Sequence, residues 1–225
     1  MKVIALTGRA GSGKDTAALM LQLLTGSKSP HPYAQPGYTL DMQTIVKWWE
    51  ENQFPFDCLN SQIGFEVHKF AWPVYQIAAI LIDRNPYDMM NAKFKTEKNV
   101  WQKLNGRELL QKVGTECFRN VLGEDTWIHM MDNKLRRAKG RTNGVVISDL
   151  RFLNEDAFSR GAKAIIIKLI DRDSSVPTTH QSESELDQIQ PDYTIQNTGT
   201  YAELMQHLSG ICKHHRIFNC KYSWK

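Results

Sequence analysis

The chain has 225 residues, and at roughly 100 to 200 residues per domain this length favours one compact domain spanning residues 1–225. Its 41% hydrophobic and 23% charged residues are typical of a globular protein and exclude a disordered or fibrous chain. The longest apolar run, residues 77–82, is far shorter than the roughly 20 residues of a membrane span, and the N-terminus shows no secretory pattern. We therefore expect a soluble cytoplasmic protein with no membrane partner.

The net charge of +4 is concentrated near the C-terminus. The basic residues of the segment 211–225, which contains no Asp or Glu, account for the whole excess, and we interpret residues 213–225 as a basic tail. The rest of the chain has no net charge, so there is no strong support for a nucleic-acid partner. A second basic run, residues 134–141, ends a predicted helix; we interpret it as cations at a helix C-terminus, with a nucleic-acid patch as the alternative.

The four cysteines are scattered through the chain, which is not the density of a disulfide framework. We expect reduced thiols. Cys212, His214, His215 and Cys220 could be drawn as a metal site, but they lack the paired short spacings of zinc modules. A helix end followed by a loose tail is the preferred interpretation.

The chain opens with an apolar run at residues 2–7, a glycine-rich turn at residues 8–13 and a helical pattern at residues 16–24. This order predicts a strand, a loop and a helix. Residues 27–63 begin with several prolines and continue with apolar residues at helical spacing until Pro55. We interpret residues 27–63 as an inserted helical segment.

A second strand is predicted at residues 65–70, with Pro73 at the first position of the helix that follows. Residues 86–104 show no clear pattern. Asn105 is predicted to cap a helix that ends at Gly123, and apolar residues predict another helix at residues 127–135. The face of the helix capped by Asn105 is predicted to carry Leu109, Leu110, Val113 and Cys117.

The second half alternates apolar strands with short helices. Strands are predicted at residues 145–147, 164–170 and 193–195, and Ser182 with Glu185 and Thr200 with Glu203 fit capping boxes. Continuous rather than alternating apolar runs indicate burial on both faces of a parallel sheet. We therefore predict an α/β fold of three layers, α/β/α, with a five-stranded parallel sheet that binds its ligand at the carboxyl ends of the strands.

The turn after the first strand fits the pattern G-x-x-x-x-G-K, a phosphate-binding loop. Its glycines let backbone N–H groups turn inward, while the lysine and the start of the helix face the negative charge. The residues predicted to surround the phosphates are Gly8, Arg9, Gly11, Ser12, Gly13, Lys14, Asp15 and Thr16.

The loop departs from the general pattern because Asp15 follows the lysine where Ser or Thr is usual. Thr16 lies one residue later, and one residue rotates a helical side chain by about 100°, so Thr16 cannot take the usual magnesium position. Asp15 could hold the metal through a water molecule. The alternative is an acidic first-turn residue that the helix dipole favours.

The loop, with its final Gly-Lys-Asp-Thr, resembles that of the phage-type deoxynucleoside monophosphate kinases, a P-loop kinase family. The likeness recurs in four further blocks in order along the chain. These are KFAWP at 69–73; RELLQKVGTE at 107–116 with Arg119 and Trp127; DLR at 149–151 with Asn154 and Glu155; and HQSE at 180–183 with NTGT at 197–200. The resemblance implies a P-loop NTPase-type fold. At Tyr75 the family often has lysine, and residues 27–63 match no block.

The resemblance implies a kinase that transfers the γ-phosphate of ATP, with Mg²⁺, to a deoxynucleoside monophosphate. Such a reaction mainly needs positioning and neutralisation of charge. Lys14 would bridge the β- and γ-phosphates, and Asp149, at the end of a buried strand, would hold magnesium through water. A surface turn is the alternative for Asp149. The implied catalytic residues are Lys14, Arg107, Arg119, Asp149 and Arg151, and the implied metal contacts are Asp15 and Asp149.

Two further groups of residues follow from the resemblance. Arg172, Asn197 and Gly199 would contact ATP, the last two near adenine, while His180, Ser182 and Glu183 would belong to a lid. For each arginine, the alternative to phosphate binding is a solvated side chain or a structural ion pair. Thr200 is explained as a helix cap. The implied acceptor contacts are Lys69, Phe70, Ala71, Trp72, Arg107, Gln111, Thr115, Glu116 and Arg119.

Other functions remain open at this stage. The same loop occurs in kinases of phosphomevalonate and dephospho-coenzyme A, and a nucleotide-hydrolysing switch or a DNA-packaging NTPase would use it to hydrolyse ATP. The oligomeric state cannot be read from the sequence, and a homodimer is one alternative. A phage origin would place the protein in the host-cell cytoplasm.

Overall fold

The computed structural model describes residues 1–25, 64–171 and 181–217. The predicted insertion at 27–63 therefore lies outside the described residues, as do Arg172, His180 and Cys220. Among the described residues, no helix has both the length and the apolar character that crossing a membrane would require.

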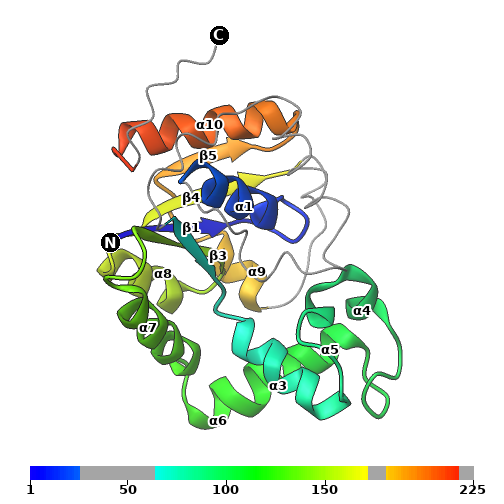
Figure 1. The fold of residues 1–225 in the computed structure, drawn as a ribbon. Coiled ribbons are helices and arrows are strands. Elements are labelled where there is room, and N and C mark those ends of the chain that lie inside the picture. Colours follow the sequence, from blue (N-terminus) through cyan, green and yellow to red (C-terminus); the bar gives the residue numbers. More distant parts are fainter. Residues whose placement is uncertain (26–63, 172–180, 218–225) are drawn as a thin grey trace.

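Five parallel strands form one sheet, as predicted (Figure 1). Their order across the sheet is β2-β3-β1-β4-β5, so the first strand lies at the centre. Because β3 and β4 both pair with β1, the segments that leave their carboxyl ends meet at the same edge as the glycine-rich turn. The strands are β1 (Lys2–Thr7), β2 (Phe65–His68), β3 (Gly144–Leu150), β4 (Ile165–Ile170) and β5 (Tyr193–Gln196).

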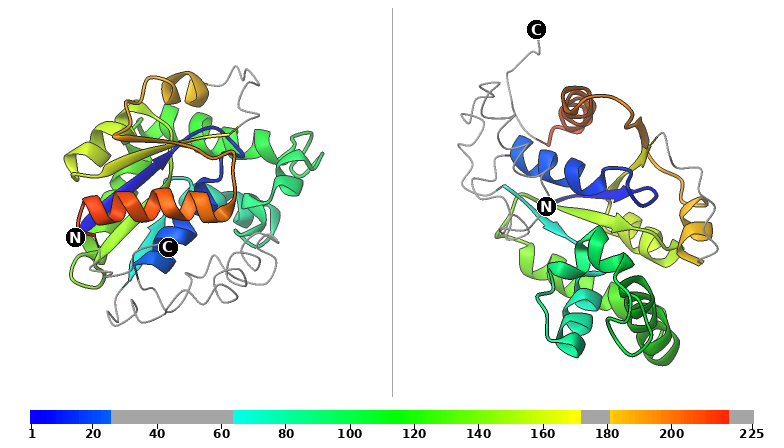
Figure 2. Two further views of the ribbon diagram at one scale, coloured as in Figure 1. Left: turned by 90° about the horizontal axis from the view of Figure 1, so that it is seen from above. Right: turned by 90° about the vertical axis from the view of Figure 1, so that its right-hand side faces the viewer.

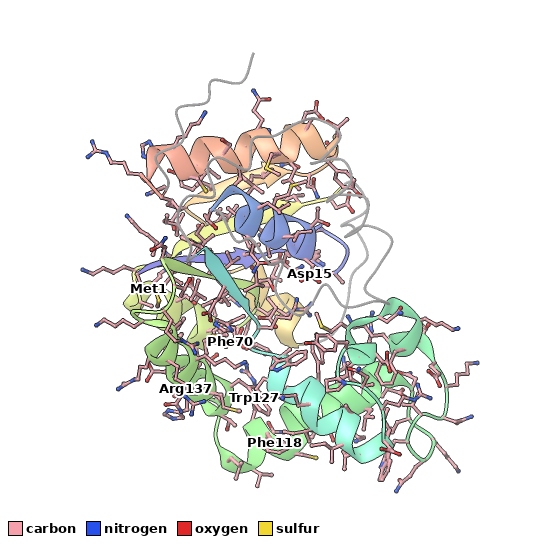
Figure 3. The ribbon with its side chains drawn as sticks, in the orientation of Figure 1. Met1, Asp15, Phe70, Phe118, Trp127 and Arg137 are labelled. Atoms are coloured by element: carbon pink, nitrogen blue, oxygen red, sulfur yellow. The ribbon has the colours of Figure 1, made fainter. Side chains whose placement is uncertain are left out.

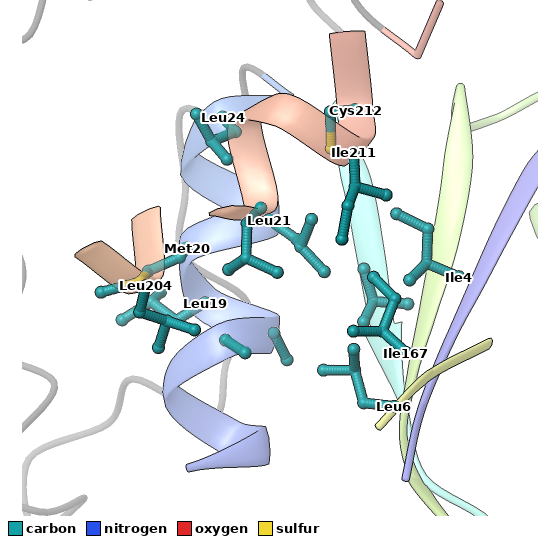
Figure 4. Packing of buried hydrophobic residues seen from close by; sticks show 14 of the residues in the cluster. Ile4, Leu6, Leu19, Met20, Leu21, Leu24, Ile167, Leu204, Ile211 and Cys212 are labelled. Atoms are coloured by element: carbon teal, nitrogen blue, oxygen red, sulfur yellow. The ribbon is translucent and has the colours of Figure 1, made fainter. Parts of the chain in front are cut away.

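Both faces of the sheet are buried, and alternate residues of β1 serve different cores. Ile4 and Leu6 pack with α1 (Lys14–Leu24) and α10 (Tyr201–His214), as Figure 4 shows. Val3 and Ala5 point to the opposite core, which includes residues of α7 (Thr126–Ala138). The continuous apolar runs of the sequence follow from this double burial.

Helices cover both faces, and a lobe of short helices extends the second layer (Figures 1 and 2). α8 (Leu153–Gly161) lies beside α7, and α9 (Gln181–Leu186) follows β4. The lobe contributes to the second core through residues such as Val74, Phe94 and Val113. It consists of α3 (Trp72–Ile82), a 3₁₀ turn (Asp88–Met90), α4 (Ala92–Thr96), α5 (Gly106–Gln111), a π-helix (Lys112–Arg119) and α6 (Asn120–Leu122).

Of the three predicted helix caps, two are confirmed and one is wrong. Asn105 and Thr200 begin α5 and α10 with complete capping boxes. α9 begins at Gln181, so Ser182 is inside the helix rather than its cap. Glu185 instead accepts a hydrogen bond from the backbone N–H of Leu153, at the start of α8. The Glu185 carboxylate, which the local pattern assigned to a capping box, therefore forms a tertiary contact with α8 instead.

The predicted burial of Cys117 is also wrong, because residues 112–119 form a π-helix. Hydrogen bonds between residues i and i+5 widen each turn of a π-helix. After Val113 the next inward position is therefore Phe118, five residues on, rather than Cys117, four residues on. Phe118 packs against the indole of Trp127, with 5.2 Å between ring centroids, while Cys117 is exposed.

The predicted tail boundary at residue 213 falls inside α10, which continues to His214. Beyond it, the ring Nε2 of His215 lies 2.9 Å from the hydroxyl of Tyr193, and Ile217 packs against the first core. Cys212 is buried in the first core, and this burial raises the pKa of its thiol to about 12. Residues 213–217 thus belong to the packed domain.

Candidate active site

The glycine-rich loop passes close to β4, which explains two of its glycines. Gly8 has φ of 140°, and a Cβ there would collide with the carbonyl oxygen of Leu169. Gly13 has φ of 87° and begins α1, and a Cβ there would collide with the side-chain amide of Asn197. Only glycine adopts these conformations in the available space without strain. These two glycines therefore let the loop pass close to Leu169 and Asn197 before α1 begins.

Lys14 is turned inward within this loop. Its ammonium donates hydrogen bonds to the carbonyl oxygens of Gly8 and Arg9, at 2.7 and 2.6 Å, and lies 3.3 Å from the hydroxyl of Ser12. Burial lowers the pKa of Lys14 to about 7, and the guanidinium of Arg151 acts in the same direction. A bound phosphate would supply the negative charge that these neutral carbonyls lack.

Lys69, at the end of β2, reaches across to the same helix terminus. Its ammonium pairs with the carboxylate of Asp15, and its side chain is 6% exposed while that of Asp15 is 57% exposed. Burial opposes the charge of Lys69, but Asp15 and Asp149 together with Tyr75 outweigh it and raise the pKa of Lys69 above its usual value. This pair ties the segment after β2 to the phosphate loop; a contact between Lys69 and substrate stays a prediction.

Asp149, at the end of β3, fixes the segment that follows Lys69. One carboxylate oxygen accepts the backbone N–H of Phe70 at 2.7 Å, and the other accepts that of Ala71 at 2.9 Å. Two hydrogen bonds from neighbouring N–H groups stabilise the ionised carboxylate. Asp149 is therefore a buried brace for this segment, and a surface turn, the alternative reading, is excluded.

A pocket opens beside the phosphate loop, between the carboxyl ends of the strands and the helical lobe. In Figure 3, Asp15 marks the start of α1, and Phe70 and Trp127 mark the pocket wall. Ala10 of the phosphate loop belongs to the same wall, so the loop and the pocket adjoin. The other lining residues are Ala71, Val74, Tyr75, Lys95, Arg107, Leu110, Gln111, Gly114, Thr115, Arg119, Asp149, Arg151, Phe152 and Glu155.

The π-helix brings one row of side chains to this pocket. Along an α-helix, residues spaced by four drift by about 40° at each step, so Arg119 would lie about 120° around the axis from Arg107. The wider turns from 112 to 119 reduce this drift. Arg107, Gln111, Thr115 and Arg119 consequently all line the pocket.

Two predicted acceptor contacts lie elsewhere. Glu116 is exposed on the outside of the π-helix, where its carboxylate pairs with Lys112 at 2.8 Å. Trp72 packs against the first core and against the ring of Tyr87, with 5.1 Å between centroids. Neighbouring residues in a helix or turn point in different directions, so a block that resembles the family need not place every member in the site.

Arg119 differs from Arg107 because its charge is already balanced within the protein. The Arg119 guanidinium donates to the Glu155 carboxylate at 2.5 Å and stacks 3.7 Å from the ring centroid of Phe152. Both Arg119 and Glu155 are buried, whereas Arg107 is exposed. Burial raises the pKa of Glu155 to about 7, although Arg119 opposes the shift. The Glu155 carboxylate also accepts hydrogen bonds from the backbone N–H groups of Arg151 and Phe152, so it positions the segment that follows β3.

Comparison with known proteins shows the family of this chain. Residues 59–208, about two thirds of the chain, match the family described as deoxynucleotide monophosphate kinase. The chain belongs to this family. It is also 24% identical over 220 residues to the deoxynucleoside-5′-monophosphate kinase of Escherichia phage T5, covering 81% of this chain and 84% of that protein.

Asn197, a predicted nucleotide contact of the kinase, lies beside its phosphate loop. Asn197, after β5, donates its side-chain N–H to the carbonyl of Ser12 at 3.0 Å. Gly199 is two residues further on, at the start of α10. The guanidinium of Arg9 pairs with Asp187 at 2.7 Å, which links the loop to the segment after α9. The structure thus brings Asn197 to the loop, while contacts of these residues with ATP stay predictions.

Sequence reasoning missed several residues of the pocket. Lys95 lies in a segment with no clear pattern, and Leu110 was assigned only to a core face. Trp127 and Glu155 were part of the matching blocks but received no role. Tyr75 stood out only as a departure from the family, yet it lines the pocket, and burial raises its pKa above the usual value. A search for polar residues near the ends of strands would have found Glu155, but no local signal points to Lys95.

Proposed function

We propose that this kinase transfers the γ-phosphate of ATP to a deoxynucleoside monophosphate and releases ADP and a deoxynucleoside diphosphate. The observation that carries the proposal is that Ala10 belongs both to the phosphate loop and to the lining of the pocket. The loop therefore adjoins a pocket that is lined by cations. The family match supports this acceptor over phosphomevalonate or dephospho-coenzyme A. It does not extend to residues 8–16, so the phosphate loop is a separate observation.

The donor would bind at the loop and the N-terminus of α1. Backbone N–H groups of residues 8–13 and the ammonium of Lys14 would contact the β- and γ-phosphates. Asn197, held against Ser12, marks the side on which the adenosine part would extend. This arrangement leaves the γ-phosphate directed towards the pocket.

The acceptor would bind with its phosphate at the cationic end of the pocket. A monophosphate carries close to two negative charges at pH 7, because its second pKa is near 6, so no strong general base is needed. An acceptor phosphate oxygen forms the new bond to the γ-phosphorus, and the bond from that phosphorus to the β–γ bridging oxygen breaks. Arg107 and Arg151 would reduce the repulsion between the two phosphates.

Part of the pocket lining suits a base. Phe70, Val74 and Trp127 provide apolar and aromatic surface, and the indole N–H of Trp127 is held by the carbonyl of Gly114 at 2.9 Å. Gln111 and Thr115 supply hydrogen-bonding groups from the same wall. Stacking with a few directed polar contacts is the usual way in which a protein recognises a base.

Magnesium fits the donor set of this site. Mg²⁺ is commonly held by one or two carboxylates together with substrate phosphates and water, and Asp15 and Asp149 are the carboxylates at the loop and at the end of β3. Each carboxylate retains lone pairs beyond those used by Lys69 and the backbone. Among the described residues there is no cluster of three side-chain ligands, so the phosphates would complete the shell. When bound, the metal would neutralise phosphate charge.

A hydrolase is the second candidate to test. Water as nucleophile would not require a second cationic pocket, which is why the geometry favours transfer. We place the activity in the cytoplasm, where ATP and nucleotides are available; for a phage protein this is the host cytoplasm. A homodimer stays a prediction.

A coupled assay decides between these functions. The protein is incubated with MgATP and a panel of deoxynucleoside and ribonucleoside monophosphates, and ADP release is measured. We expect release that depends on a deoxynucleoside monophosphate and is lost in Lys14→Ala. Release of ADP that is independent of every monophosphate would overturn the kinase mechanism in favour of hydrolysis.

A further inference from the structure

The short helix α4 presents a lysine to the pocket. This lysine belongs to none of the sequence blocks that resemble the family. Lys95 lines the same pocket as Ala10, Arg107 and Arg151, although it lies in the segment 86–104 that has no readable pattern. Its side chain is half-buried, unlike that of Lys93 on the same helix, which is exposed. The two lysines are therefore chemically identical but differently placed.

α4 is held firmly enough to fix where Lys95 points. Phe94 is 3% exposed in the second core, and a Cβ on Gly106 would collide with the carbonyl oxygen of Phe94, so α4 and α5 pack closely. At the end of α4, the N–H of Gly106 bonds to the carbonyl of Glu97 at 3.1 Å. The Glu97 carboxylate forms two hydrogen bonds, each 2.7 Å long, with the guanidinium of Arg84. These contacts join α3, α4 and α5 around the pocket.

The surroundings of Lys95 are rich in positive charge. Arg151, Lys69 and Arg107 all act on it, and Asp15 is the acidic group that offsets them. Burial lowers the pKa of Lys95 to about 8, and Arg151 acts in the same direction. Among the described residues, no carboxylate or carbonyl is hydrogen-bonded to its ammonium. A cation crowded by like charges is stabilised by an anion with two negative charges.

We propose that Lys95 contacts the phosphate of the acceptor from the helical lobe. This inference rests on the proposed function and adds to it a phosphate contact supplied by the helical lobe. Lys14 approaches the donor from the loop, and Arg151 approaches from the sheet. Lys95 is the cation that the lobe contributes beside Arg107. The lobe would therefore take part in binding phosphate as well as base.

The test compares Lys95→Met, Lys95→Arg and the matched control Lys93→Met. For a deoxynucleoside monophosphate that the wild type phosphorylates, we expect Lys95→Met to raise the acceptor KM by about 10- to 100-fold, since a charge-assisted hydrogen bond is lost. The KM for ATP should change little. Lys95→Arg should recover much of the loss, and Lys93→Met should behave as wild type.

A binding measurement separates contact with phosphate from general damage to the pocket. Calorimetry with the same monophosphate and with the corresponding deoxynucleoside, which lacks phosphate, should show that Lys95→Met weakens only the former. An unchanged KM for the acceptor, or equal weakening of both ligands, would overturn the role of Lys95. Failure of the proposed function would show differently, as a wild-type protein that phosphorylates no monophosphate.

Discussion

Asp149 at the end of β3 accepts a 2.7 Å hydrogen bond from the backbone N–H of Phe70, which follows β2. Its other oxygen accepts the next N–H, that of Ala71, at 2.9 Å. An acid at a position typical of magnesium ligands therefore also fixes the wall of the acceptor pocket. Changes at Asp149 should affect both stability and acceptor binding.

Asp149→Asn tests this double role. An amide offers one acceptor oxygen, and its NH₂ group would face the second backbone N–H, so one charge-assisted bond is lost. We expect the free energy of unfolding to fall by about 1.5 to 3 kcal/mol and the acceptor KM to rise. Urea denaturation and steady-state kinetics measure the two effects, with Asp132→Asn on the surface of α7 as control. Wild-type stability would contradict the bracing role.

Arg107 and Arg119 should respond differently to replacement by Met. Arg119→Met leaves Glu155 buried without its cation, which should cost about 3 to 5 kcal/mol of unfolding free energy. Arg107 is exposed, so Arg107→Met should leave stability unchanged and raise the acceptor KM by about 10- to 150-fold. Adding Glu155→Met to Arg119→Met should recover part of the lost stability. Equal destabilisation by the two single changes would argue against this distinction.

The two glycines Gly8 and Gly11 form a matched pair for testing the loop. Both have positive φ, but a Cβ at Gly8 meets the backbone of β4, whereas nothing lies within 4 Å of a Cβ at Gly11. Gly11→Ala should therefore cost only the backbone strain, on the order of 1 kcal/mol, and Gly8→Ala clearly more. Thermal or chemical denaturation of the two variants measures the difference. The reverse order would show that the loop is placed differently.

His68 should make the protein sensitive to acid. Burial lowers its pKa from 6.5 to about 4, and Lys134 and Arg141 add to the shift. Between these values the unfolded chain binds the proton and the folded chain does not, so stability falls as pH drops from 6.5 to 4. His68→Gln should reduce the fall in the free energy of unfolding between pH 6.5 and 4 by about 2 to 3 kcal/mol.

The measurement is the free energy of unfolding of wild type and variant at several pH values across this window. His129→Gln, at an exposed position of α7, is the control and should lose stability as the wild type does. Parallel curves for wild type and His68→Gln would show that His68 contributes nothing to acid sensitivity.

Local patterns were sufficient for the framework of the domain. The order of strand, glycine-rich turn and helix at residues 2–24 was read from apolar runs and turn residues. The caps at Asn105 and Thr200 were found because each requires only residues three apart. The parallel sheet followed from strands buried on both faces. The blocks at 107–116 and 149–151 indicate the family and contain part of the pocket lining.

Only the tertiary structure decided which residues of those blocks meet in the pocket. The π-helix turned Cys117 outward and Arg119 inward, because its register depends on packing against Trp127 and the second core. Lys95 reached the pocket because Phe94 and Gly106 dock α4 on α5. The sequence by itself determined the strands, the caps at Asn105 and Thr200, and the phosphate loop, since these depend on neighbouring residues. The charges that share the pocket were decided by contacts between residues far apart in the chain, which no local pattern encodes.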